Sequence, residues 1–171
     1  MKYDFEALNE VLLYNKNTGE ISWKDRNGTP GSKSFNSKYA GRTATNLDRG
    51  GYLGVSIGGE WFVAHRVAWV LHYGSINEEL HVDHVNHDRA DNRISNLRMV
   101  DRGVNSKNRS PSSNTKYCLG VSFRKNRGKF QAKISSDGRT HYLGTFGSLL
   151  DACCARKSAE ISMGFHKNHG K

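Results

Sequence analysis

The sequence lacks a long hydrophobic run. No stretch of about 18 consecutive apolar residues occurs, so we expect no membrane-spanning helix. The N-terminal segment MKYDFEALNE has no basic stretch followed by an apolar one, so no secretory signal peptide is predicted. We therefore expect a protein that is not secreted, has no membrane partner and works in the cytoplasm.

Cysteine is also scarce. The three cysteines, Cys118, Cys153 and Cys154, form no CxxC pair, and an odd number with two adjacent residues is a poor disulfide framework. We expect them to be packing residues in a reducing cytosol. No cysteine lies near the histidines at 81–87, which argues against a cysteine-type zinc-finger regulator, and no zinc is expected.

Acidic residues are nearly absent from the C-terminal part of the chain. Residues 102–171 contain 14 Lys and Arg against 3 Asp and Glu, whereas residues 1–101 contain 12 against 13. Because this basic segment also has regularly spaced aromatic and aliphatic residues, it predicts a folded nucleic-acid-binding module. A solvated basic surface without a partner remains an alternative.

Hydrophobic periodicity predicts a mixed α+β protein. The first 24 residues favour a short helix followed by a hairpin, and residues 28–50 favour a polar loop with at most a short strand near 41–45. Alternating apolar residues around a GG turn predict a second hairpin over 53–63. The segment HRVAWVLHYG that follows predicts a buried helix ending at Gly74.

The polar stretch NSKNRSPSSNTK at 105–116 is the best domain boundary in the chain. We predict a first domain over 1–109, a linker over 110–117 and a second domain over 118–171. The second domain should contain three antiparallel strands with turns at NRG and SDG, followed by a helix whose first turn is capped by Ser148 and Asp151.

The densest group of chemically active side chains lies between His81 and Arg109. Its sharpest pattern is the pair Asp83 and His84, followed by Asn96 and then Asn105. Adjacent strand residues point to opposite faces, so Asp83 and His84 can serve one site only if the strand bends and another element packs beside it. Phosphodiester hydrolysis requires a base for water and a cation for the phosphate, which a neutral histidine and oxygen ligands of a divalent ion can supply.

The stretch VDHVNHDRADNRISNLRMVDRGVNSKN resembles the HNH endonucleases, specifically the phage group with Asn as the last motif residue. The preceding segments AHRVAW and LLYNKNTGEISWK also fit, so the resemblance covers most of residues 8–109. It implies a ββα-metal fold in which Asp83 and Asn105 bind one divalent ion, Mg²⁺ or possibly Mn²⁺. It further implies that His84 is the general base and that Asn96 completes the catalytic geometry by bracing the loop.

Other polar residues of this region receive more ordinary roles. His65 matches a family position where a structural hydrogen bond is expected, and Asp91 and Asn92 should cap or brace backbone. Basic residues of the motif are expected to contact DNA phosphates, although a solvated helix face explains some of them nearly as well; they are Arg93, Arg98, Lys107 and Arg109.

The segments GVSFRKNRGKFQAKI, YLGTF and DACCARKSAE resemble the AP2 DNA-binding domain over about residues 118–166. The resemblance implies a three-stranded sheet packed on one helix, with a basic outer sheet face that lies in the DNA major groove. The DNA-contact positions of the family fall on Ser122, Arg124, Lys133, Ser135, Thr140 and Tyr142. Several lack the arginine or tryptophan usual in plant members, so no base specificity carries over.

Taken together, these features predict a metal-dependent DNA endonuclease of the homing type, targeted to double-stranded DNA by its C-terminal module. One active site per chain favours nicking by a monomer, and double-strand cleavage would require a weak dimer or sequential nicks. The alternative is a DNA-binding regulatory or architectural protein with an inactive nuclease domain.

Overall fold

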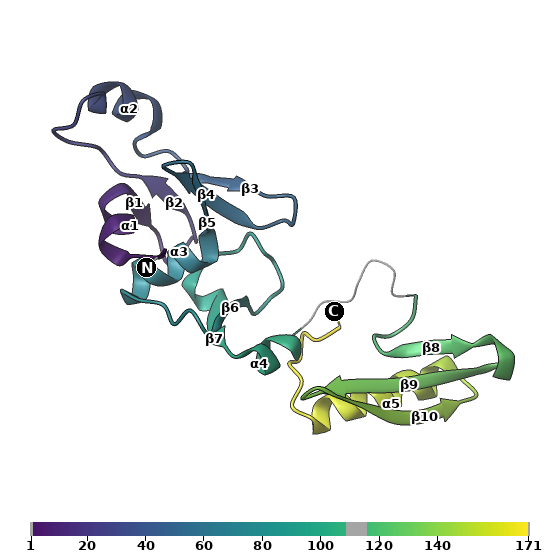
Figure 1. The fold of residues 1–171 in the computed structure, drawn as a ribbon. Coiled ribbons are helices and arrows are strands. Elements are labelled where there is room, and N and C mark those ends of the chain that lie inside the picture. The colour runs from purple at the N-terminus through teal and green to yellow at the C-terminus, as the bar shows by residue number, and fades with distance from the viewer. Residues whose placement is uncertain (1, 109–115, 171) are drawn as a thin grey trace. The chain divides into compact units, whose positions relative to one another are not determined.

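The structure is a computed structural model that describes residues 2–108 and 116–170. It has the predicted mixed α+β composition and divides into two compact units, Met1–Val100 and Asp101–Lys171 (Figure 1). Across the described residues, no helix is long and apolar enough to cross a membrane.

The first unit contains three small antiparallel sheets and three helices among its described residues (Figure 1). The strands pair as β1–β2, β3–β4–β5 and β6–β7. The elements in chain order are α1 (Phe5–Val11), β1 (Leu12–Tyr14), β2 (Ile21–Trp23), α2 (Ser32–Tyr39), β3 (Thr45–Leu47), β4 (Leu53–Ile57), β5 (Glu60–Val63), α3 (Ala64–Tyr73), β6 (His81–His84), the 3₁₀ turn η1 (Ile94–Asn96) and β7 (Leu97–Val100).

Helix α3 is the centre of the first core. It packs against α1, β1, β4, β5 and β6, and its residues Val67, Ala68 and Val70 are fully buried. The helix ends at Gly74, which adopts a left-handed conformation with φ of 82°, as expected of a C-terminal cap. The predicted hairpin and buried helix of this region are therefore present, and they place β6 against the core.

Residues 28–50 contain a helix that periodicity did not reveal. Helix α2 has no buried residue, so it lacks the apolar stripe that identifies a helix in sequence. It is held instead by the side chain of Asn36, which bonds both backbone groups of Arg26, and by Phe35, whose ring packs edge-on against Trp23. The prediction of a loop is thus wrong for this segment.

The second unit contains the predicted three strands and long helix. Its elements are α4 (Arg102–Ser106), β8 (Val121–Arg124), the 3₁₀ turn η2 (Lys125–Arg127), β9 (Lys129–Ser136), β10 (Arg139–Phe146) and α5 (Leu149–Ser162). The sheet is antiparallel in the order β10–β9–β8, and α5 packs against all three strands. Ser148 caps α5 by accepting a hydrogen bond from the backbone N–H of Asp151. The relation of this unit to the AP2 domain stays a prediction.

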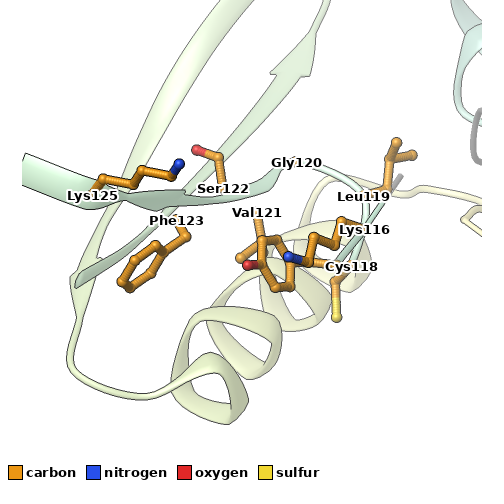
Figure 2. Close-up of a pocket in the computed structure, with 9 residues that line it drawn as sticks. Lys116, Cys118, Leu119, Gly120, Val121, Ser122, Phe123 and Lys125 are labelled. Atoms are coloured by element: carbon orange, nitrogen blue, oxygen red, sulfur yellow. The ribbon is translucent and has the colours of Figure 1, made fainter. Parts of the chain in front are cut away.

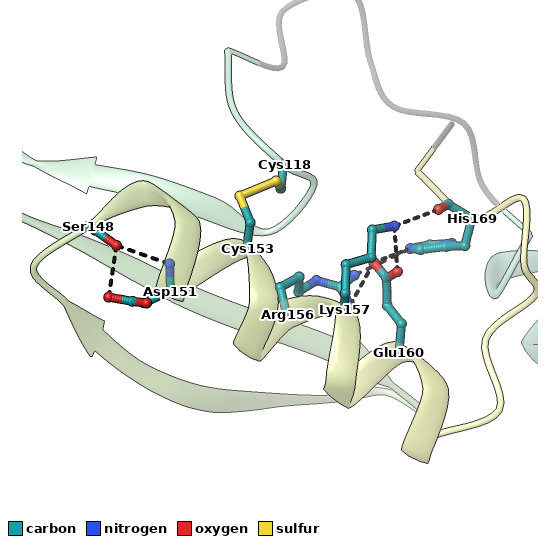
Figure 3. Close-up of a disulfide and its surroundings, with 8 residues drawn as sticks. All are labelled: Cys118, Ser148, Asp151, Cys153, Arg156, Lys157, Glu160 and His169. Carbon is teal, nitrogen blue, oxygen red and sulfur yellow. Dashed lines mark hydrogen bonds and ion pairs between the residues drawn. A yellow bond between two sulfur atoms is a disulfide. The ribbon is translucent and has the colours of Figure 1, made fainter.

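The cysteine prediction is wrong for two of the three residues. Cys118 and Cys153 form a disulfide with a Cα–Cα distance of 5.9 Å, which joins the segment before β8 to α5 (Figure 3). They lie 35 residues apart in sequence, so only the packing of α5 on the sheet brings them together. Cys154 is free and exposed, because the next helical position points away from the sheet.

A buried charged cluster lies on the same helix. Arg156 and Glu160, one helical turn apart, form an ion pair at 3.1 Å, and His169 lies 3.3 Å from the Arg156 guanidinium (Figure 3). Lys157 bridges Glu160 and the backbone oxygen of His169. Burial lowers the pKa of Arg156 from its ordinary value. These contacts anchor the C-terminal segment to α5.

The compact units divide between Val100 and Asp101, so α4 is grouped with the second unit. The predicted boundary lies later, and residues 110–115 of the predicted linker fall outside the described residues. The division into domains at 109 and 118 therefore stays a prediction.

Candidate active site

Strands β6 and β7 form a two-stranded antiparallel ribbon that carries the predicted catalytic pair. Asp83 lies opposite Arg98 and His84 lies opposite Leu97. Val82 and His84 are buried, whereas His81 is exposed and Asp83 is partly exposed. The two site residues therefore lie on opposite faces of the ribbon, as the pleat requires.

The carboxylate of Asp83 is bound by Arg98. The Nε and Nη2 atoms of Arg98 donate to Oδ2 of Asp83 at 3.0 and 2.8 Å. Cross-strand opposite charges of this kind stabilise a sheet. Arg98, predicted to contact phosphate, thus neutralises the predicted metal ligand, and any cation at Asp83 must share this carboxylate with the guanidinium.

The side chain of His84 points into the unit. It is 5% exposed, and its Nε2 lies 3.1 Å from Oδ1 of Asn92, which is 1% exposed. The ring of His65 meets the ring of His84 edge-on at 4.9 Å, and the ring of Tyr52 lies 6.1 Å away. The side chains of Asn92, His65 and Tyr52 therefore surround the predicted base. The sequence predicts that Asn92 caps or braces the backbone, so its contact with His84 is an additional finding.

His65 lies beside His84 and has a strongly lowered pKa. Burial, followed by the charges of His84 and Arg66, lowers the pKa of His65 from 6.5 to about 3. Its Nδ1 is buried without a hydrogen-bond partner in the described parts of the chain. The structural hydrogen bond predicted for His65 is thus replaced by ring packing, and a neutral imidazole lies beside His84 at physiological pH.

Asn96 closes the loop between β6 and β7. Its Oδ1 accepts from the backbone N–H of Asn86 at 3.0 Å, and its Nδ2 donates to the backbone oxygen of Asp91 at 2.8 Å. The Asn96 backbone oxygen also accepts from Val85 N–H at 2.9 Å. This is the bracing geometry expected of Asn96 from the sequence; its place in catalysis stays a prediction.

Arg93 and Asp91 form a second ion pair in this loop. Two nitrogens of Arg93 bind the two carboxylate oxygens of Asp91 at 2.8 and 2.6 Å. The hydrogen-bonded guanidinium holds the pKa of Asp91 below its usual range. The Arg93 side chain remains 51% exposed, so the predicted phosphate contact is sterically open.

The N-terminal hairpin supports the same loop. The hydroxyl of Tyr14 donates to the backbone oxygen of Asn92 at 2.7 Å. The backbone N–H of Ile94 donates to the backbone oxygen of Lys16 at 3.1 Å. Gly19, with φ of 79°, lies so close that a Cβ there would be 2.6 Å from the nitrogen of Arg93. A glycine is therefore required for the hairpin to approach the loop.

Asn105, the second predicted metal ligand, lies on α4. Asp101 caps this helix by accepting from Val104 N–H at 2.8 Å. Since α4 belongs to the second compact unit, the distance from Asn105 to Asp83 is not defined by the structure. By chemistry, one carboxylate and one amide oxygen suit a hard divalent cation. No group of three or more His, Cys, Asp or Glu side chains that could hold a metal occurs within residues 2–108 and 116–170.

Lys107 follows α4 and is engaged inside the second unit. Its ammonium group lies 3.7 Å from the carboxylate of Asp137 and 5.8 Å from the ring centre of Phe165. A phosphate contact by Lys107 would therefore compete with Asp137. Arg109, also predicted to contact phosphate, lies outside the described residues.

The six predicted DNA contacts of the C-terminal sheet lie on one face. Strand register places Lys133 opposite Tyr142 and Ser135 opposite Thr140, and the hydroxyls of the latter pair are 2.9 Å apart. Alternation along β8 places Ser122 and Arg124 on the same face, away from buried Val121. A pocket of about 720 Å³ borders β8, where Figure 2 shows Ser122 on the opposite side of the strand from Val121 and Phe123.

The shifted pKa of His65 predicts a pH-dependent stability. The unfolded chain protonates this side chain near pH 6.5 and the folded protein only near pH 3, so stability present above pH 6.5 is lost as the pH falls. The slope reaches about 1.4 kcal/mol per pH unit for one proton. The free energy of unfolding, measured with urea between about pH 7.5 and 5, should fall with this slope in the wild type and less steeply in His65→Gln. Parallel curves for the two proteins would contradict the assignment, and the exposed His141→Gln variant controls for loss of a histidine.

Comparison with known proteins agrees with the motif. Residues 62–107, from β5 through α4, match the family model of the HNH endonucleases. An uncharacterised HNH endonuclease of Acanthamoeba polyphaga mimivirus is 35% identical over 78 residues, which are 45% of this chain; the chain matches 40% of that relative's length.

A solved structure of the HNH homing endonuclease I-HmuI, described as showing DNA binding and cleavage, is 24% identical. The alignment covers 98% of this chain and 92% of that one with a TM-score of 0.45, too low to establish a common arrangement of the units. The family match is shorter than the 8–109 range of the resemblance seen in the sequence, but it contains the predicted catalytic and metal-binding residues, Asp83, His84, Asn96 and Asn105. The predicted phosphate contact Arg109 lies outside it. The segment 62–107 is therefore similar to the HNH endonucleases over the part of the chain that carries Asp83, His84, Asn96 and Asn105.

Proposed function

We propose that the chain is a metal-dependent endonuclease that hydrolyses phosphodiester bonds in double-stranded DNA. The observation that carries this proposal is the HNH match over the segment in which the β6–β7 ribbon presents Asp83 and His84. The enclosed position of His84, fixed between Asn92, His65 and Tyr52, suits a base that must keep one orientation.

In the proposed reaction, His84 accepts a proton from the water that attacks the phosphorus in line with the leaving 3′ oxygen. Neutral His65 beside it adds no second positive charge, so the imidazolium formed on His84 meets no charged histidine neighbour. Arg98 is bound to Asp83, so its guanidinium would lie beside a DNA phosphate at this site and can offset the negative charge of the phosphate. Asn96 keeps the loop between these residues closed.

Asp83 and Asn105 are the residues proposed to hold one divalent ion, Mg²⁺ or Mn²⁺. Such an ion polarises the phosphate and stabilises the leaving oxygen. The carboxylate and amide oxygens fit its preference for hard ligands. Asp83 would then serve two cations, the metal and Arg98, a demand that one carboxylate with two oxygens can meet.

The second unit is proposed to grip the DNA. Its sheet face places Lys133 and Arg124 among small polar side chains, which is typical of phosphate anchoring. An AP2-like reading of the major groove by this face would make the enzyme site-selective in the manner of a homing endonuclease. Arg93, Arg98, Lys107 and Arg109 would add phosphate contacts around the cleavage site.

Tethering of the two units would let a weak nuclease act at selected sites, because a linked module raises the effective concentration of DNA at the active site. One site per chain favours a nicking monomer, with double-strand cleavage by a weak dimer or by successive nicks. The cytoplasm remains the proposed location, although the disulfide is unusual for that compartment.

Replacing the proposed base, His84, should slow cleavage strongly. With Mg²⁺, wild-type protein should convert supercoiled DNA to nicked circles, and EDTA should stop the reaction. His84→Ala should cut slower by about 10²-fold or more, as expected for loss of a general base. His81→Ala is the matched control, since this histidine lies on the same strand and is exposed. Gel quantification of the nicked product measures each rate.

The same experiment separates the competing functions. A wild-type protein that binds DNA in a mobility-shift assay but never cuts it with any divalent ion would favour the regulatory or architectural alternative. If His84→Ala cut as fast as His81→Ala, the assignment of the base would be wrong.

Removal of one phosphate contact from the sheet should weaken binding without changing sequence preference. Lys133→Ala should lower the affinity for all DNA sequences alike and reduce the slope of log K against log salt by about 1. The exposed Lys167→Ala variant, outside the sheet, serves as control. Fluorescence anisotropy over a salt series measures the slope, and an unchanged slope for Lys133→Ala would remove this side chain from the interface.

A further inference from the structure

Residues 24–42, which we call the α2 lobe, carry a concentrated positive charge. Residues 1–101 as a whole are almost neutral, with 12 Lys and Arg against 13 Asp and Glu. The lobe contains five of these basic residues and one of the acidic ones, which leaves 7 basic against 12 acidic in the rest. The lobe is thus strongly basic on a unit that is otherwise acidic, and such a local positive potential attracts a polyanion.

The lobe is closed at its base by backbone pairing with β2. The N–H of Trp23 donates to the backbone oxygen of Arg42 at 3.0 Å, and the N–H of Gly41 donates to the backbone oxygen of Trp23 at 2.9 Å. The chain therefore leaves β2 and returns to the same strand. Figure 1 shows α2 beyond β1 and β2, apart from α1 and α3. The lobe is a closed projection from the first unit.

One face of α2 docks the helix onto the base of the lobe. Phe35 and Asn36 lie on this face and are half-buried. The Phe35 ring packs edge-on against Trp23 at 5.8 Å. The Asn36 side chain accepts from the backbone N–H of Arg26 at 2.8 Å and donates to its backbone oxygen at 2.9 Å. These contacts fix which side of the helix faces away from the protein.

The outward face of α2 consists of two lysines and two serines. With about 3.6 residues per turn, these four positions share the side opposite Phe35 and Asn36. All four are exposed; they are Lys33, Ser34, Ser37 and Lys38. Neither lysine forms an ion pair with any residue that the structure describes. Cationic groups and hydroxyl donors are the side chains that contact phosphate oxygens on DNA, so this face has the composition of a phosphate-binding surface.

Two exposed arginines flank the helix. The guanidinium of Arg26 stacks on Phe35, with its carbon 3.6 Å from the ring centre. Stacking of this kind fixes the plane of a guanidinium and leaves N–H groups at its edge for an anion. Arg42 is exposed at the other end of the lobe. Neither arginine forms an ion pair within residues 2–108 and 116–170.

The lobe suits DNA better than an anionic membrane. A helix that binds a lipid surface buries an apolar face in the membrane. The outward face of α2 has no apolar residue, and Phe35 is turned toward Trp23. A rigid row of cations and hydroxyls instead matches a regular array of phosphates.

We propose that the α2 lobe is a further DNA-binding surface, which contacts the phosphate backbone of double-stranded DNA through Lys33 and Lys38. This inference rests on the proposed function, because it takes the substrate DNA as the ligand. The lobe belongs to the same compact unit as β6 and β7. It therefore holds DNA on the unit that carries the catalytic ribbon, in addition to the grip proposed for the C-terminal sheet.

The salt dependence of DNA binding tests the two lysines in the full-length protein. Lys33→Gln/Lys38→Gln should reduce the slope of log K against log salt by about 2 and weaken binding about tenfold or more near 0.1 M salt, because two phosphate contacts are lost. Lys2→Gln/Arg49→Gln is the matched control, since it removes two exposed positive charges of the same unit outside the lobe. Fluorescence anisotropy with a mixed-sequence double-stranded DNA fragment, without divalent ions, measures each slope.

Chemical protection of the wild type locates the surface without any variant. Acetylation should modify Lys33 and Lys38 in the free protein, and bound DNA should protect both from it. The exposed Lys2 should react equally with and without DNA. Mass spectrometry of the digested protein measures each site. Equal reactivity of Lys33 and Lys38 in the free and bound protein would overturn the inference.

The remaining outcomes separate this inference from the proposed function. A nicking enzyme whose salt slope is the same in Lys33→Gln/Lys38→Gln as in the control would remain a nuclease without a DNA contact in the lobe. A wild type that shows the predicted slopes and protection but never cuts DNA with any divalent ion would keep the lobe and lose the nuclease function. Binding to anionic phospholipid vesicles that the lysine variant loses, with its DNA affinity unchanged, would assign the lobe to membranes and overturn the inference.

Discussion

The site depends on the closure of one loop by two buried asparagines. Asn96 binds the backbone on both sides of the loop between β6 and β7, and Asn92 projects from it to the ring of His84. Buried amides of this kind stabilise a structure only when their partners are in place. The N-terminal hairpin supplies part of that support through Tyr14 and the close approach of Gly19. Tyr14, 78 residues before Asn92 in the sequence, thus supports the loop that contacts His84.

The β-pleat places the two proposed site residues on opposite faces of the ribbon. Asp83 is partly exposed and paired with Arg98, whereas His84 is buried beside Asn92, His65 and Tyr52. The pleat thus separates the charged pair from the imidazole. In the proposed reaction, both must act on one phosphate, which requires the strand to bend or another element to complete the site.

Much of the fold and of the site could be predicted from the sequence where the pattern is local. Alternation and turns located the hairpins, the helix before Gly74 and the strands of the second unit. The motif spacing singled out Asp83, His84 and Asn96, which the structure places on one ribbon and its loop; their roles stay predictions. Contacts between residues distant in sequence could not be predicted: Cys118 with Cys153, Arg98 across the ribbon from Asp83, and His169 with Arg156 of α5. Helix α2 was missed because it buries nothing. The contact of Asn92 with His84 was missed because asparagine is common in turns, and only the packing directs its amide at His84.

The central claim is that Asp83 and Asn105 hold the metal while His84 remains a base. A crystal structure of the full chain with uncleaved DNA and Mn²⁺ tests it most directly, since anomalous scattering locates the ion. The account predicts one ion coordinated by the oxygens of Asp83 and Asn105 and by a DNA phosphate, with no bond to the His84 ring. An ion bound to His84, or one bound away from Asp83, would contradict it.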